Sequence, residues 1–142
     1  MTGRDFIACA GRLARNSAEA ELRSAVSRAY YGAFHEARVL LRDSGIRLPR
    51  TEQVHIKIVY CLQDCDDPVA EDAGHLLDRL RDQRTVADYE LDDPRFANAK
   101  KVRWEVAQAQ HIIDCLDRCR KSAEFRAKVR VHAAFLGLPV SD

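Results

Sequence analysis

The chain has 142 residues, with 46% hydrophobic residues, 32% charged residues and a formal net charge of +1. This length and mixture are typical of one globular domain and exclude a disordered polymer. The small net charge gives no general attraction for nucleic acid or an anionic membrane, so such contacts would need a local patch. No apolar run approaches the roughly 18 residues of a membrane span, and no signal segment follows Met1. We therefore expect one cytoplasmic domain over residues 1–142 that has no membrane segment.

Apolar periodicity and helix-terminating residues predict six helical segments. In the first, Phe6 and Ile7 face inward. The pair Asn16-Ser17 follows, and short polar side chains of this kind are typical N-caps of the next helix. Gly45 marks the end of that second helix. The predicted segments cover residues 4–15, 17–44, 51–65, 68–84 with fraying to 93, 94–121 and 123–136.

Prolines mark the later helix starts. Asp67-Pro68 begins the fourth helix because proline is tolerated in a first turn, and Pro94 opens the fifth in the same way. The last segment, 123–136, is either a short docked helix or a mobile tail. No run alternates apolar and polar residues as a half-buried strand does. Short loops between amphipathic helices favour an all-α, antiparallel up-and-down bundle of four to five helices plus a short C-terminal helix.

The second helix has an apolar face and an opposite cationic and aromatic face. At about 100° per residue, one side is expected to face the core and carries Val26, Tyr30, Ala33, Phe34, Ala37 and Leu41. The other side carries Ser24, Arg28, Tyr31, His35, Arg38 and Arg42. Arginine forks match phosphate oxygens, so this face is a candidate anion site. The alternative is that Tyr31 and His35 cover a seam with a neighbouring helix or a second subunit.

The run from Ser27 to Ala37 reads SRAYYGAFHEA, and the run from Leu80 to Tyr89 reads LRDQRTVADY. The first run resembles the second-helix signature of HEPN-domain proteins, in particular a branch of small stand-alone prokaryotic members. The second resembles an arginine followed by Ala-Asp-Tyr that members of this branch carry at the end of the fourth helix. Together with the helix order, the resemblance covers about residues 17–121. Residues 122–142 would be a C-terminal extension of one HEPN-like domain.

The resemblance implies a four- or five-helix bundle that pairs as a homodimer. Many HEPN proteins are metal-independent ribonucleases of toxin–antitoxin, anti-phage or CRISPR systems, whereas others are binding or nucleotide-sensing modules. The nuclease members carry an arginine, four to six intervening residues and a histidine, and two subunits bring these motifs together in a cleft. Arg84 matches the arginine, but Asp88 and Tyr89 stand where the histidine and its neighbours would be.

Metal-free RNA cleavage requires proton transfers at the 2′-hydroxyl and at the leaving oxygen, beside a cation that stabilises the phosphorane. Histidine suits proton transfer because its ordinary pKa is about 6.5, whereas an aspartic acid near 4 is a poor acid. His35 lies seven positions after Arg28 on one face of the second helix, so it is the candidate substitute for the missing histidine. The predicted catalytic residues are Arg84, Asp88 and His35.

The predicted substrate-binding residues are Arg28, Tyr31, Arg38 and Tyr89. Our hypothesis is that one polar pocket is lined by Arg28, His35, Arg84, Asp88 and Tyr89. In the alternative interpretation, Asp88 forms an ion pair with Arg28 or Arg84 and Tyr89 caps the bundle. That arrangement would be a buried network without turnover.

Five cysteines without close pairing favour reduced thiols. Helical spacings that could bind zinc occur at Cys61 and Cys65, and at His111, Cys115 and Cys119. Cysteine is also an ordinary small core residue, and no glycine-rich phosphate loop is present, so we expect no metal and no cofactor. Three isolated histidines are interpreted as surface or seam residues: His55, His75 and His132.

Three functions follow as hypotheses. The first is a HEPN-like module of a prokaryotic defence or toxin–antitoxin system that binds RNA and, if the substitute residues suffice, cleaves it without metal. The second is a non-catalytic helical dimer that serves as an adaptor or subunit of a larger effector complex. Its partner would be a nucleotidyltransferase antitoxin or a larger defence effector, and the missing histidine favours it. The third is a nucleotide sensor that uses the same arginines.

Overall fold

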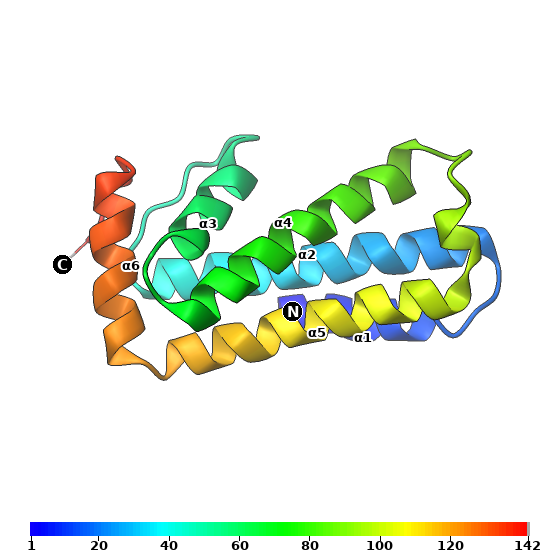
Figure 1. Ribbon diagram of the computed structural model, residues 1–142, viewed down its shortest axis with the longest axis horizontal. Helices are drawn as coiled ribbons and strands as arrows, with labels where there is room; N and C mark the ends of the chain where they lie inside the picture. Colours follow the sequence, from blue (N-terminus) through cyan, green and yellow to red (C-terminus); the bar gives the residue numbers. More distant parts are fainter. Residues whose placement is uncertain (142) are drawn as a thin grey trace.

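Six α-helices and one short 3-10 helix make up the computed structural model, which describes residues 1–141 (Figure 1). In chain order they are α1 (Gly3–Leu13), α2 (Glu19–Asp43), α3 (Val54–Gln63), α4 (Pro68–Tyr89), η1 (Pro94–Ala97), α5 (Ala99–Arg120) and α6 (Ala123–Phe135). The predicted all-α bundle with a short C-terminal helix is confirmed. Over this described range, none of the helices has the length and apolar character needed to cross a membrane.

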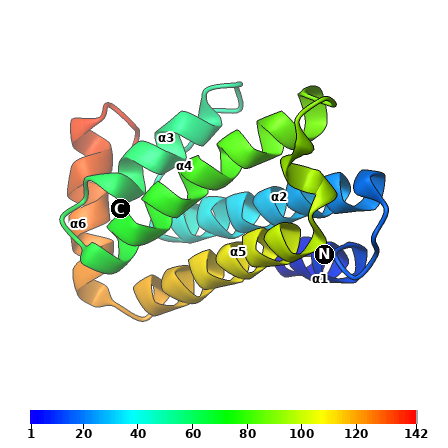
Figure 2. The same ribbon diagram turned by 45° about the vertical axis from the view of Figure 1, so that its right-hand side comes forward.

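Helix α2 is the central element of the bundle. It packs against α1, α4 and α5, while α3 packs on α4. Figures 1 and 2 show α1, α2 and α5 along the long axis, with α6 across one end. The apolar face predicted for this helix is confirmed, because all six of its residues are at most 8% exposed: Val26, Tyr30, Ala33, Phe34, Ala37 and Leu41. The opposite residues Arg28, Tyr31 and His35 are only partly exposed.

Helices α1 and α2 approach each other most closely at two glycines. A Cβ atom on Gly32 would lie 2.6 Å from Cδ1 of Ile7 and 2.8 Å from the carbonyl oxygen of Gly3. A Cβ atom on Gly3 would in turn collide with the carbonyl oxygen of Gly32. Only glycine therefore fits at either position without moving a helix. This close approach brings Phe6 of α1 to the face of α2 that holds Arg28.

The junction between α1 and α2 differs from the prediction. The expected N-cap at Asn16-Ser17 is wrong, because α2 begins at Glu19 after Ala18 and has no side-chain cap. Asn16 instead donates a hydrogen bond from its Nδ2 to the carbonyl oxygen of Leu13, and so completes the end of α1. The carboxylate of Glu19 in the first turn favours the helix start through the macrodipole.

Helix α4 is longer than predicted, and α5 begins later. The expected fraying from Arg84 is wrong, because the helix continues to Tyr89. Pro94 does not open α5 but begins η1, and the side chain of Asn98 then caps α5. The extension of α4 puts Arg84 and Asp88 one turn apart on a regular helix.

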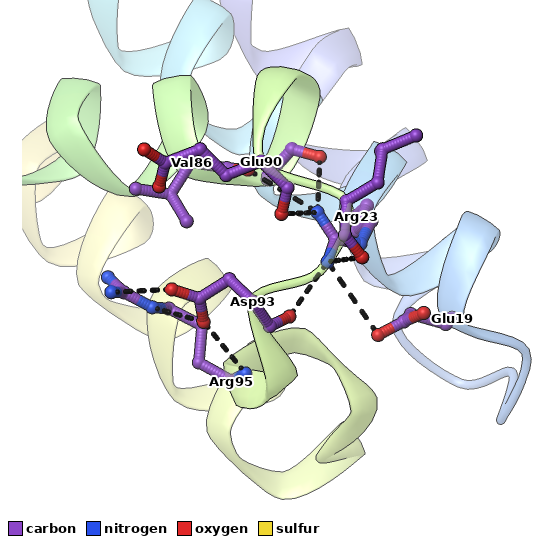
Figure 3. A network of polar contacts seen from close by, with 8 residues as sticks. Glu19, Arg23, Val86, Glu90, Asp93 and Arg95 are labelled. Atoms are coloured by element: carbon purple, nitrogen blue, oxygen red, sulfur yellow. Dashed lines mark hydrogen bonds and ion pairs between the residues drawn. The ribbon is translucent and has the colours of Figure 1, made fainter.

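The end of α4 is held by the buried Arg23 of α2, as Figure 3 shows. The guanidinium donates hydrogen bonds of 2.8–3.3 Å to the main-chain oxygens of Val86, Ala87, Glu90, Leu91 and Asp93. Its Cζ atom also lies 5.5 Å from the ring centroid of Phe96, and its Nη2 lies 3.7 Å from a carboxylate oxygen of Glu19. A planar guanidinium has five donors, so one side chain can serve several carbonyl groups at once. This explains why α4 does not fray.

Helix α6 docks across the end of the bundle. Its buried side consists of Phe125, Val129 and Ala133. Arg126 and Arg130 donate hydrogen bonds of 2.7 and 2.9 Å to the main-chain oxygens of Asp43 and Ser44, at the end of α2. These oxygens have no partner inside α2, because the last carbonyl groups of any helix lack one. Of the two alternatives for residues 123–136, the docked helix is correct.

Replacing Arg23 by methionine is expected to lower the free energy of unfolding by about 3 kcal/mol, because carbonyl groups in a buried setting lose a charged donor. The measurement is urea denaturation followed by circular dichroism. The free energy of unfolding of Arg23→Lys should lie between those of the wild type and Arg23→Met. An ammonium group keeps the charge but cannot donate to the same carbonyl groups in one plane.

Arg15→Met is the matched control, because Arg15 is exposed. It should change the free energy of unfolding by less than about 0.5 kcal/mol. The role of Arg23 would be refuted if Arg23→Met were no more destabilising than this control.

Candidate functional site

Arg84 reaches from α4 to two tyrosine rings of α2. Its Cζ atom lies 5.5 Å from the ring centroid of Tyr30 and 5.6 Å from that of Tyr31. The side chain is 14% exposed, and its Nε atom is buried with no hydrogen-bond partner within residues 1–141. A cation–π contact holds a guanidinium in place without consuming its N–H donors. Arg84 is thus fixed in position while part of its donor capacity stays unused.

Asp88 connects α4 to α2. Its Oδ2 atom lies 3.4 Å from Nη1 of Arg84 and accepts a hydrogen bond of 3.3 Å from Oγ of Ser27. Of the two ion-pair partners expected for Asp88, the structure therefore has Arg84. Both distances are long for hydrogen bonds, so Asp88 compensates the charge of Arg84 only weakly. We call the group Ser27, Arg28, Tyr31, Arg84 and Asp88 the α2–α4 strip.

Arg28 is also held by aromatic rings. Its Cζ atom lies 4.9 Å from the ring centroid of Phe6 and 5.3 Å from that of Tyr31. No ion pair involves Arg28 within the part of the chain that the structure describes. Tyr31 therefore lies between two guanidinium groups, those of Arg28 and Arg84. This role of Phe6 does not follow from its predicted inward-facing position, because its partner Arg28 lies on another helix.

His35 lies in an aromatic setting next to the strip. Its ring centroid is 5.8 Å from that of Phe6 and 6.5 Å from that of Tyr31. Burial lowers the pKa of His35 below its ordinary value of 6.5, and the charges of Arg38 and Arg28 lower it further. The ring is therefore neutral at pH 7, and it can accept a proton.

His35 and Arg84 do not line the same hollow. His35 lines a surface hollow of about 700 Å³ at the start of α1, together with residues such as Glu36. Arg84 and Asp88 do not line this hollow. The ring of Tyr31 contacts both His35 and Arg84, so the predicted residues form a continuous line of contacts. They do not form the single pocket that the sequence analysis expected.

Two predicted binding residues lie outside this line of contacts. Arg38 is exposed, and its charge acts on His35. Tyr89 is the last residue of α4 and is 74% exposed. The alternative interpretation, in which Tyr89 caps the bundle, is therefore wrong. Tyr89 also makes no contact with the strip through the rings or hydrogen bonds described above.

A buried tyrosine–histidine pair lies under the strip and was not predicted. Oη of Tyr30 lies 2.6 Å from Nδ1 of His55, and Nε2 of His55 lies 3.4 Å from Oδ1 of Asp78. Burial raises the pKa of Tyr30, so its hydroxyl stays protonated and donates to Nδ1. His55 is 4% exposed, which makes it a seam residue rather than a surface one. No sequence spacing signals this group, because α2, α3 and α4 each supply one member.

Comparisons with protein-family models, with curated protein sequences and with solved structures gave no match. The molecule is thus characterised by its own structure, a helical bundle with ring-supported arginines between α2 and α4.

The stability of the protein is expected to fall as the pH is lowered from about 7 to 5. Burial lowers the pKa of His55 below its ordinary value of 6.5, although the hydrogen bond that His55 donates to Asp78 acts in the opposite direction and raises it. The unfolded chain then binds a proton that the folded chain excludes, so each such group costs up to about 1.4 kcal/mol per pH unit in this window. Urea denaturation at several pH values measures the slope.

His55→Gln should flatten this dependence of stability on pH. His35→Gln should also reduce it, because the pKa of His35 is lowered in the folded chain as well. His132→Gln is the control, because His132 contacts a main-chain oxygen outside this region. A slope in His55→Gln equal to that of the wild type would contradict the assignment.

Proposed function

We propose that this chain is a HEPN-like cytoplasmic module that binds RNA along the α2–α4 strip, in a prokaryotic defence or toxin–antitoxin system. The observation that carries the proposal is the support of Arg28 and Arg84 by aromatic rings, with only one long ion pair, from Arg84 to Asp88. Ring contacts leave N–H donors free, and a guanidinium with free donors matches phosphate oxygens. The HEPN resemblance covers the residues that form this strip.

The aromatic rings of the strip favour single-stranded RNA as the ligand. Unpaired bases stack on aromatic and arginine planes, and each such contact contributes about 1–3 kcal/mol. The rings of Tyr31 and His35 are only partly buried and lie beside the arginines. Arg38 adds a further positive charge at the margin. Because the net charge of the whole chain is close to zero, binding of nucleic acid needs a local positive patch, and this cluster provides one.

Cleavage needs more than the strip provides within one chain. A neutral His35 suits the role of proton acceptor, and Arg84 could stabilise a phosphorane. Asp88, however, already accepts from both Arg84 and Ser27, and an aspartic acid is in general a poor proton donor for the leaving oxygen. We therefore propose binding as the function, and we treat metal-independent cleavage as an activity that depends on a homodimer's second copy of the strip.

Arg84→Ala and Arg28→Ala are each expected to weaken binding of a single-stranded RNA about tenfold, because each removes a phosphate contact. The slope of log affinity against log salt should also fall by about 0.7 for each contact that is lost. Fluorescence anisotropy over a range of salt concentrations measures both quantities. EDTA is present throughout, so metal plays no part.

Arg47→Ala is the matched control, because Arg47 is an exposed arginine at the other end of α2. Equal losses in all three variants would indicate general charge attraction and would rule out the strip. Cleavage products are followed in the same samples. Turnover by the wild type that His35→Ala abolishes would extend the proposal from binding to ribonuclease activity.

A non-catalytic dimeric adaptor is the second candidate, and one observation favours it. Val131 and Phe135 of α6 are 74% and 84% exposed, beside a hollow of about 580 Å³. Exposed apolar side chains next to a hollow are typical of protein contacts, here with a second copy, a nucleotidyltransferase antitoxin or a larger effector.

On this second candidate, light scattering after size exclusion should give the mass of two chains for the wild type and of one chain for Phe135→Ser. Ala134→Ser on the same helix is the control, because Ala134 is exposed but small. A wild-type protein that is monomeric at all concentrations would leave α6 without a role in self-association.

A further inference from the structure

A second cluster of reactive side chains lies between α4 and α5, outside the α2–α4 strip. Asp72 of α4 faces His111 and Cys115 of α5. Oδ2 of Asp72 lies 3.2 Å from Nε2 of His111, and Sγ of Cys115 lies 3.6 Å from that Nε2 and 3.9 Å from that Oδ2. One carboxylate, one imidazole and one thiol thus meet at a single point.

The distances within this cluster match a metal coordination shell. A tetrahedral zinc ion with bonds of about 2.0–2.3 Å separates its ligand atoms by roughly 3.3–3.8 Å. The three ligand atoms of Asp72, His111 and Cys115 lie 3.2–3.9 Å apart, so an ion can sit over the triangle that they form with little movement. An ordinary surface ion pair between Asp72 and His111 would not need the nearby thiol of Cys115.

We propose that Asp72, His111 and Cys115 bind one Zn²⁺ ion, with the fourth position open to solvent. The carboxylate and the thiolate balance the two charges of the ion, and the neutral imidazole completes a set of O, N and S donors that zinc accepts. Asp72 and His111 are exposed whereas Cys115 is 3% exposed, so the ion would lie at the protein surface with one side facing water.

The scaffold places the three donors without help from a flexible loop. His111 and Cys115 are one turn apart on α5, and α4 packs directly against α5 and brings Asp72 to them. The sequence spacing grouped Cys119 with His111 and Cys115, but the side chain of Cys119 is buried in the core cluster that also contains Cys65. The third ligand comes from α4, which no spacing along the chain can reveal.

Zinc binding is tested on the full chain after treatment with EDTA and dialysis. Isothermal titration with Zn²⁺ should show one ion per chain. Titration with Co²⁺ should give the visible bands of tetrahedral cobalt and a thiolate-to-cobalt charge-transfer band in the near ultraviolet. Zn²⁺ should also raise the melting temperature of the wild type, because a ligand that binds the folded state stabilises it.

Asp72→Asn, His111→Gln and Cys115→Ala should each weaken Zn²⁺ binding by about a hundredfold or more, and Cys115→Ala should abolish the charge-transfer band. The first two changes are at exposed positions, and circular dichroism verifies the fold of all three. Cys9→Ser and His132→Gln are controls for binding by other thiols and imidazoles, and both should keep wild-type affinity.

Wild-type affinity in Cys115→Ala, or a cobalt spectrum without the thiolate band, would overturn the proposal. So would an equal loss of affinity in Cys9→Ser. The outcome is independent of RNA binding, because the anisotropy experiments contain EDTA and concern another face of the bundle.

Discussion

The position of the candidate site depends on the hydrogen bonds from Arg23 to the last turn of α4 and the segment that follows. Helices normally leave their final carbonyl groups without partners, and those ends fray unless another group serves them. One buried guanidinium from α2 performs this task for several carbonyls. As a result α4 stays regular to Tyr89, and Arg84 and Asp88 are fixed against the rings and hydroxyl of α2. A charge in the bundle thereby determines where two other charges lie.

The ring-supported arginines give the bundle a surface whose chemistry differs from that of an ordinary solvated face. Most exposed arginines spend their donors on water or on a neighbouring carboxylate. Arg28 is instead held by Phe6 and Tyr31, and Arg84 is held by Tyr30 and Tyr31 beside one long ion pair with Asp88. Preorganised cations of this kind lose less conformational freedom when they bind an anion. The cluster of Asp72, His111 and Cys115 is likewise positioned by two rigid helices, α4 and α5.

The sequence predicted what depends on periodicity along a single helix. The bundle, the core face with Val26 and Leu41, and the line of Arg28, Tyr31 and His35 all follow from the helical repeat. The sequence failed where a partner lies far away in the chain. Arg23 stabilises α4 across more than sixty positions, Phe6 approaches Arg28 from α1, and His55 meets Tyr30 from α3. Local signals such as Asn16-Ser17 and Pro94 misled because capping depends on which neighbouring groups are free.

The contact between Gly3 and Gly32 has an effect well beyond the two residues themselves. Neither glycine has a side chain to offer, yet the gap between the two backbones determines how far Phe6 extends over α2. Even one added methyl group would act as a wedge, and the aromatic platform beneath Arg28 would then open. The positions of the ring-supported arginines can therefore be altered without a change of any polar residue. A change in the distance between α1 and α2 is sufficient.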